Sequence, residues 1–371
     1  MFAKILVITL ILSVIFTCPV MALTVEEEYS KQFETSGANE ILEVIPDNII
    51  EGLSNLGLDI KNQQFEINIE ALFKTILDYI YSSITSPLTT FGVILTILFV
   101  CYLFSTLTIG ERQKEIISYI SAVILCSGTV FPIAELFNKT SSAVSLCCGF
   151  NIVLIPIYSG ILFASGSVKS LGTINLLFVF SQGIEVFIST IFSPLVSIYT
   201  SLSICGSLNT SINFSNITTA FKKIIDWVLG ITVTLYMGIL VITGTISSIS
   251  DSVTQRMGKF VINSSIPIVG GVISDSLSTI LGALKYLKSS IGLYAVCALA
   301  LILLPVFIEI LLWRLVLIVS SFIADMLNQD TAASLIKSIS NGVGIILSVI
   351  ISSLVVFLIS MVVVVMGGSG I

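Results

Sequence analysis

Long runs of apolar residues without a single charge most constrain how this chain can fold. Residues 289–308 and 338–366 each form such a run. A helix needs roughly 20 mainly apolar residues to cross the hydrocarbon core of a bilayer. Charged residues make up only 10% of the chain, whereas a soluble globular protein has about 25%. The sequence therefore predicts an all-α polytopic membrane protein and argues against a water-soluble enzyme.

Eight apolar segments can enter a bilayer, and we expect about eight membrane segments, within a range of six to ten. Two of these segments, 171–205 and 290–326, are far longer than one span needs. Each is either two tightly connected spans or one broken helix. Pro194 interrupts the first and Pro305 the second. The segments are 88–109, 116–137, 144–165, 171–205, 226–248, 261–284, 290–326 and 342–366.

An internal repeat of about 110 residues is predicted from the spacing of prolines. Pro156 and Pro267 are 111 positions apart, as are Pro194 and Pro305. The possible units are 114–222 and 223–337. Proline removes a backbone donor, so we expect helix breaks or re-entrant segments, although Pro and Gly also serve as packing and kink residues in membrane helices. The candidate breaks are Pro156, Gly160, Pro194, Pro267, Gly270, Gly271 and Pro305.

The first 22 residues have the pattern of a secretory signal peptide. Lys4 precedes a short apolar stretch, and Ala22 supplies a small residue at the expected cleavage site. The alternative is an uncleaved anchor. With a cleaved signal, the mature N-terminus lies outside the cytoplasm. If both repeat units behave alike, the number of later crossings is even, and we expect the C-terminus at Ile371 to be extracytoplasmic as well.

Residues 23–86 form a strongly acidic segment before the polytopic domain at 87–371. The segment holds 12 acidic residues against three lysines, a net charge of −9. Apolar residues recur there at helical spacing, as in Ile49, Leu53 and Leu56. We expect a small helical extracytoplasmic region. It is either a solvated cap over the membrane domain or a docking surface for another protein.

A few charged residues fall inside the apolar segments and are the candidate site residues. A charge at the bilayer centre costs about 2.5–3.5 kcal/mol, so each should face protein or water. Glu185, Asp275 and Glu309 either line a polar pathway or join helices or subunits, and Arg314 lies five residues after Glu309. Glu135, near a segment end, is better explained as a structural contact.

No catalytic or cofactor-binding pattern is present in the sequence. The chain contains no histidine, no phosphate-binding loop and no Cys-x-x-Cys motif. Basic residues are not concentrated in one stretch, which argues against binding nucleic acid. We therefore expect no enzyme activity, no cofactor and no metal site.

The order of these features resembles the stage III sporulation protein AE family of endospore-forming bacteria. The resemblance rests on the acidic region with Val44-Ile45-Pro46 and Leu56-Gly57-Leu58-Asp59, and above all on the segment Ser265-Ile266-Pro267-Ile268-Val269-Gly270-Gly271 followed by Ser274-Asp275. It extends over nearly the whole chain.

The resemblance implies a permease-like membrane subunit of a channel or feeding-tube complex required for endospore development. Its implied partners are an ATPase, ring-forming proteins and other membrane subunits, together with a forespore membrane partner across the intermembrane space. The implied location is the mother-cell membrane facing the forespore. The alternative hypothesis is an autonomous secondary transporter, in which Glu185, Asp275 and Glu309 couple ion and substrate movement.

Overall fold

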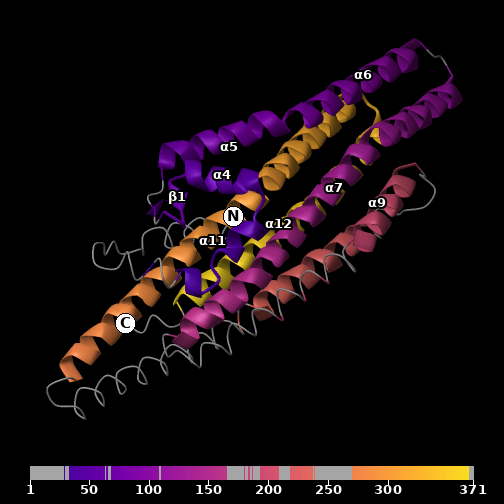
Figure 1. Ribbon diagram of the computed structural model, residues 1–371. Helices are drawn as coiled ribbons and strands as arrows, with labels where there is room; N and C mark the ends of the chain where they lie inside the picture. Colours follow the sequence, from indigo (N-terminus) through magenta and orange to yellow (C-terminus); the bar gives the residue numbers. More distant parts are fainter. Residues whose placement is uncertain are drawn as a thin grey trace.

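In the computed structural model, most of the chain forms long helices that run side by side (Figure 1). The signal-peptide prediction for residues 1–22 lies outside the described residues, and so do Glu185 and Pro267. The structure describes residues 29, 33–62, 64–65, 68–107, 110–164, 179, 183, 186, 193–208, 218–236, 238 and 270–366.

Four helices in the described part of the chain are long and apolar enough to cross a membrane. The prediction of an all-α membrane protein is therefore confirmed. The count of about eight segments and the repeat of about 110 residues remain predictions, because much of both repeat units lies outside the described residues. The four helices are Ile69–Leu107, Arg112–Ala164, Ser289–Met326 and Asp330–Leu358.

Two helices are much longer than the sequence segmentation predicts. Helix α7 (Glu111–Ala164) has 54 residues and joins the segments predicted at 116–137 and 144–165. The intervening residues are polar at 138–142 and end in Ala143, but they include neither glycine nor proline, so nothing in them stops a helix. Helix α11 (Gly270–Met326) has 57 residues. At 1.5 Å per residue, each helix is about 80 Å long, well beyond the roughly 30 Å of a hydrocarbon core.

The acidic N-terminal region is mainly helical, as predicted, but it also contains a small hairpin. Strand β1 (Leu58–Asp59) pairs antiparallel with β2 (Gln64–Phe65). The Asp59 carboxylate accepts hydrogen bonds from the backbone amides of Lys61 and Asn62, at 2.9 and 3.0 Å, and so fixes the turn. Strands this short leave no alternating pattern to read in a sequence. The helices are α3 (Glu40–Val44), α4 (Asp47–Asn55) and α5 (Ile69–Ser83).

This N-terminal region packs against the middle of α11 (Figure 1). The ring of Tyr286 meets the rings of Tyr29 and Phe65 edge-on, with centroids 5.6 and 6.3 Å apart. Gly52 of α4 lies so close to Leu301 that an added Cβ would stand 3.4 Å from its Cδ1. The middle of α11, from Tyr286 to Leu301, is therefore covered by protein rather than left open to lipid.

The other half of the bundle exposes large apolar side chains. Many of them lie on α6 (Thr85–Leu107), on the first half of α7 and on the second half of α11, and others lie on α5 and on the helical residues 218–236. A folded chain exposes a broad apolar surface of this kind where it meets lipid or another protein. These side chains form an apolar belt that includes Phe99, Phe104, Ile120, Phe131, Leu315 and Phe322.

The turn between α11 and α12 (Asp330–Met366) is tied to two other helices by Gln329. Asn328 adopts the left-handed conformation with φ 53°, and the Gln329 amide donates to the Ala324 carbonyl at 3.0 Å, which closes α11 with a Schellman motif. The buried Gln329 side chain donates to the Leu98 carbonyl of α6 at 2.7 Å. Its Oε1 accepts from the Ser121 hydroxyl of α7 at 3.5 Å.

Replacing Gln329 by Met should destabilise the bundle. Methionine fills a similar volume but makes neither hydrogen bond, and a lost buried bond costs about 1–3 kcal/mol. We expect a lower melting temperature for the purified protein in detergent. Gln113→Met is the matched control, because Gln113 is exposed near the start of α7. An equal loss of stability in both variants would contradict this role for Gln329.

Candidate polar cleft

A cluster of charges joins α7 to α11 at the edge of the apolar belt. The Lys139 ammonium lies 2.9 Å from Oε1 of Glu309 and 3.4 Å from Oε1 of Glu135. The Glu309 side chain is only 12% exposed, against 44% for Lys139 and 58% for Glu135. The two carboxylates thus hold one cation, and Glu309 is the buried member of the cluster.

This cluster and the Gln329 contacts fix the register of α7 and α11. Ser121 contacts Gln329, and Lys139 contacts Glu309, so the two helices run antiparallel. The contacts are 18 residues apart along α7, or about 27 Å at 1.5 Å per residue. That separation is close to the roughly 30 Å thickness of a hydrocarbon core. Phe131, Leu315 and Phe322 of the apolar belt lie on the stretch of bundle between them, whereas Phe99 and Phe104 lie beyond the Gln329 contact.

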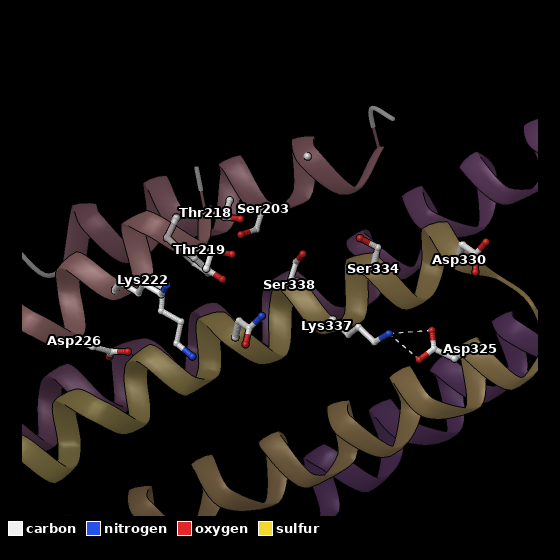
Figure 2. A pocket seen from close by; sticks show the side chains of 14 residues that line it. Ser203, Thr218, Thr219, Lys222, Asp226, Asp325, Asp330, Ser334, Lys337 and Ser338 are labelled. Carbon is white, nitrogen blue, oxygen red and sulfur yellow. Dashed lines mark hydrogen bonds and ion pairs between the residues drawn. The ribbon is translucent and has the colours of Figure 1, made fainter. Parts of the chain in front are cut away.

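A polar cleft of about 630 Å³ opens in the same half of the bundle. It lies between α9 (Ser193–Leu208), the helical residues 218–236, the end of α11 and the start of α12. Figure 2 shows Ser203, Thr218, Thr219 and Lys222 on one side of the cleft and Ser334 and Ser338 on the other. The remaining lining residues are Tyr199, Gly206, Lys223, Asp226, Asp325, Asp330, Lys337 and Asn341.

The first three turns of α12 supply one polar wall of the cleft. Asp330, Ser334, Lys337, Ser338 and Asn341 recur at spacings of three and four residues, which places them on one face of the helix. The stripe is about 16 Å long at 1.5 Å per residue. The opposite face of this stretch is apolar and buried. The polar stripe therefore extends along much of the length of the apolar belt. The exposed apolar side chains of the belt lie on the outer surface of the bundle.

The cleft carries three lysines and three aspartates. The Lys337 ammonium bonds both oxygens of Asp325, at 2.7 and 3.0 Å (Figure 2). Within the part of the chain that the structure describes, no three potential ligands gather to hold a metal ion. The arrangement suits passage of a hydrated polar solute or the binding of a polar segment, and it lacks an activated nucleophile.

Two of the predicted charged residues have clear positions in the structure. Glu309 contacts Lys139, which favours a helix-joining role over a pathway role for this carboxylate. Arg314 does not reach Glu309. Its guanidinium lies instead beside Gly344 of α12. Asp275 lies within α11, but its side chain is outside the described part, and Glu185 is outside it altogether.

Several of the predicted helix breaks are not found in the structure. Helix α7 continues through Pro156 and Gly160, and α11 continues through Pro305. A proline removes one backbone hydrogen-bond donor from a helix. A helix of more than 50 residues keeps its other backbone hydrogen bonds and its packing contacts. Pro194 is the second described residue of α9, and the residues before Ser193 lie outside the described part, so a break at Pro194 stays a prediction. Gly270 and Gly271 are the first described residues of α11, and Pro267 lies outside the description.

Sequence reasoning missed most of the cleft. The lysines at 223 and 337 stand out in the sequence because each precedes an apolar segment, but nothing connects them to one site. The usable signal is the polar stripe of Ser334, Ser338 and Asn341, whose helical spacing predicts a polar face on an otherwise apolar helix. Its partner wall at 218–226 cannot be identified without the fold.

Comparisons with known proteins give one consistent result. The model of the family described as stage III sporulation protein AE matches residues 53–368. A curated relative, the stage III sporulation protein AE of Bacillus subtilis (strain 168), is 22% identical over 233 residues. That alignment covers 61% of this chain and 58% of the length of the relative. No solved structure matches the chain.

Replacing Glu309 by Gln should weaken the contact between α7 and α11. The variant keeps the side-chain shape but removes the charge that holds Lys139, so we expect a loss of about 1 kcal/mol. Glu135→Gln is the matched control, because Glu135 is the more exposed and more distant of the two carboxylates. Melting temperatures in detergent measure both effects. A larger loss in the Glu135 variant would contradict the assignment of Glu309 as the main partner.

Proposed function

We propose, because the chain belongs to the stage III sporulation protein AE family, that it is the membrane-embedded, permease-like subunit of a multiprotein channel complex. The complex links mother cell and forespore and is required for endospore development. The observation that carries the proposal is the polar cleft, which runs beside the apolar belt in the same half of the bundle. A chain that served only as a membrane anchor would not need this polar surface.

The cleft supports a pathway role through its chemistry. Serine, threonine and asparagine side chains exchange hydrogen bonds with water and with polar solutes, and the lysine and aspartate charges compensate one another. Lys337 and Asp325 contact each other across two helices, so their charges are satisfied without blocking the remaining wall. The cleft thus suits neutral or zwitterionic cargo better than a strongly charged polymer.

The N-terminal region supports an assembly role. Helices α3 and α4 turn their apolar residues toward the bundle and expose Glu40, Glu43, Asp47 and Glu51. With this region outside the cytoplasm, its acidic face would meet basic surfaces of ring-forming subunits or of a forespore partner in the intermembrane space. An ATPase subunit would have to be a separate protein of the complex, since no phosphate-binding loop is present in this chain.

The competing proposal is an autonomous secondary transporter. In that case neutralising Glu185 or Asp275, as in Glu185→Gln and Asp275→Asn, should abolish coupled flux at normal protein levels. A complex subunit should tolerate both changes if packing is kept. Purification of the tagged protein from sporulating cells separates the two proposals directly, because only a subunit should recover ATPase and ring-forming partners.

Filling the cleft should block sporulation without removing the protein from the membrane. Ser334→Phe and Asn341→Leu place bulk on the polar wall of α12, and both positions are exposed to the cleft. We expect fewer heat-resistant spores at unchanged membrane abundance. Ser201→Phe is the matched control, since Ser201 is exposed on α9 but does not line the cleft. Normal spore counts for both cleft variants would remove the cleft from the proposed pathway.

A further inference from the structure

Two cations from different helices converge on one glycine of α12. A Cβ built on Gly344 would stand 3.3 Å from Nη1 of Arg314 and 3.7 Å from Nζ of Lys222. The two nitrogens are therefore no more than about 7 Å apart, a distance at which like charges repel. Arg314 comes from α11 and Lys222 from the helical residues 218–236.

Neither cation forms an ion pair with a carboxylate of the described residues. Glu309, the nearest acid along α11, is occupied by Lys139 at 2.9 Å. Asp226 lies one turn beyond Lys222 and within no ion-pair contact of it. Both cations are only partly exposed. Two partly buried positive charges brought together in an apolar bundle are costly unless an anion lies between them.

Gly344 is the feature that allows this arrangement. It is buried, and its missing side chain leaves the space in which the guanidinium approaches the backbone of α12. By contrast, an added Cβ at Gly342, two residues earlier, would make only ordinary contacts with Tyr199 and Thr200, at 3.6 and 3.7 Å. The close approach at Gly344 thus belongs to the two cations rather than to general helix packing.

The chemistry of the two cations and their position in the bundle together favour a bound phosphate group. Arg314 follows Glu309 by five residues, so it lies about 7.5 Å along α11 from the charge cluster at the edge of the apolar belt. This level lies between the two contacts, within the stretch of bundle that matches a hydrocarbon core, where a charge without a counter-ion is costly. A guanidinium fork with a neighbouring ammonium is a common pairing for a phosphate group.

We propose that Arg314 and Lys222 form, over Gly344, a binding site for one phosphate group. The phosphate belongs either to an anionic phospholipid headgroup or to a soluble phosphate compound. The site adjoins the cleft through Lys222, which lines it. It does not depend on whether the cleft conducts a solute.

The full-length protein, purified in a detergent that contains no phosphate, provides the test. Phosphatidylglycerol binding is counted by native mass spectrometry, and inorganic phosphate binding is measured by calorimetry. We expect one saturable phosphate-type site. Saturation by phosphatidylglycerol that inorganic phosphate does not displace identifies a lipid site, whereas direct binding of inorganic phosphate with displacement identifies a soluble ligand.

Variants locate the site. Arg314→Gln and Lys222→Gln should each weaken binding about tenfold, as expected for one charge-assisted hydrogen bond. Lys223→Gln is the matched control, since Lys223 lies next to Lys222, is exposed and lines the cleft. Gly344→Leu should occupy the site while keeping both cations. Helical content by circular dichroism checks the fold of every variant.

Two results would overturn the proposal. The first is an absence of saturable binding of either probe to the folded wild-type protein. The second is an equal effect of Lys222→Gln and Lys223→Gln, because diffuse attraction to a basic surface rather than a defined site would explain that outcome.

Discussion

The contact between Lys139 and Glu309 is the interaction on which the rest of the architecture depends. Charges inside an apolar bundle must be neutralised by protein, because lipid offers no partners. This contact lies near the middle of the 54-residue α7 and about two thirds of the way along the 57-residue α11, and it divides each helix into two sections with different surroundings. One section is covered by the acidic N-terminal region, and the other carries the apolar belt and the polar cleft.

That division explains helices that are too long for one bilayer crossing. The middle of α11 is apolar where it packs under α4 and α5, whereas the end of the helix is apolar because it faces outward at Leu315 and Phe322. The same apolar composition therefore serves packing against protein in one part of α11 and exposure on the outer surface in another. Helix α12 changes in the same way, since its first turns carry the polar stripe of the cleft and its later residues are buried among apolar neighbours.

Sequence reasoning recovered the properties that depend on composition and local spacing. The helical membrane class and the mainly helical acidic region follow from residue type and period, whereas for Glu309 the sequence left a polar pathway and a helix contact open. Contacts between distant segments could not be read in this way. The approach of Lys222 and Arg314 to Gly344 depends on the packing of three helices, and one sequence contains no record of it. The polar residues 138–142 and Pro305 suggested breaks in the helices. Both helices continue through these positions, because the surrounding hydrogen bonds and packing contacts are kept.

Accessibility of single cysteines in proteoliposomes tests the central claim most directly. In a background without native cysteines, Ser334→Cys and Asn341→Cys should react with a membrane-impermeant maleimide, because they line a hydrated cleft. Leu315→Cys and Phe322→Cys, on the apolar belt, should remain unmodified. Labelling of the belt positions without labelling of the cleft positions would contradict the account, because it would place water on the surface assigned to lipid.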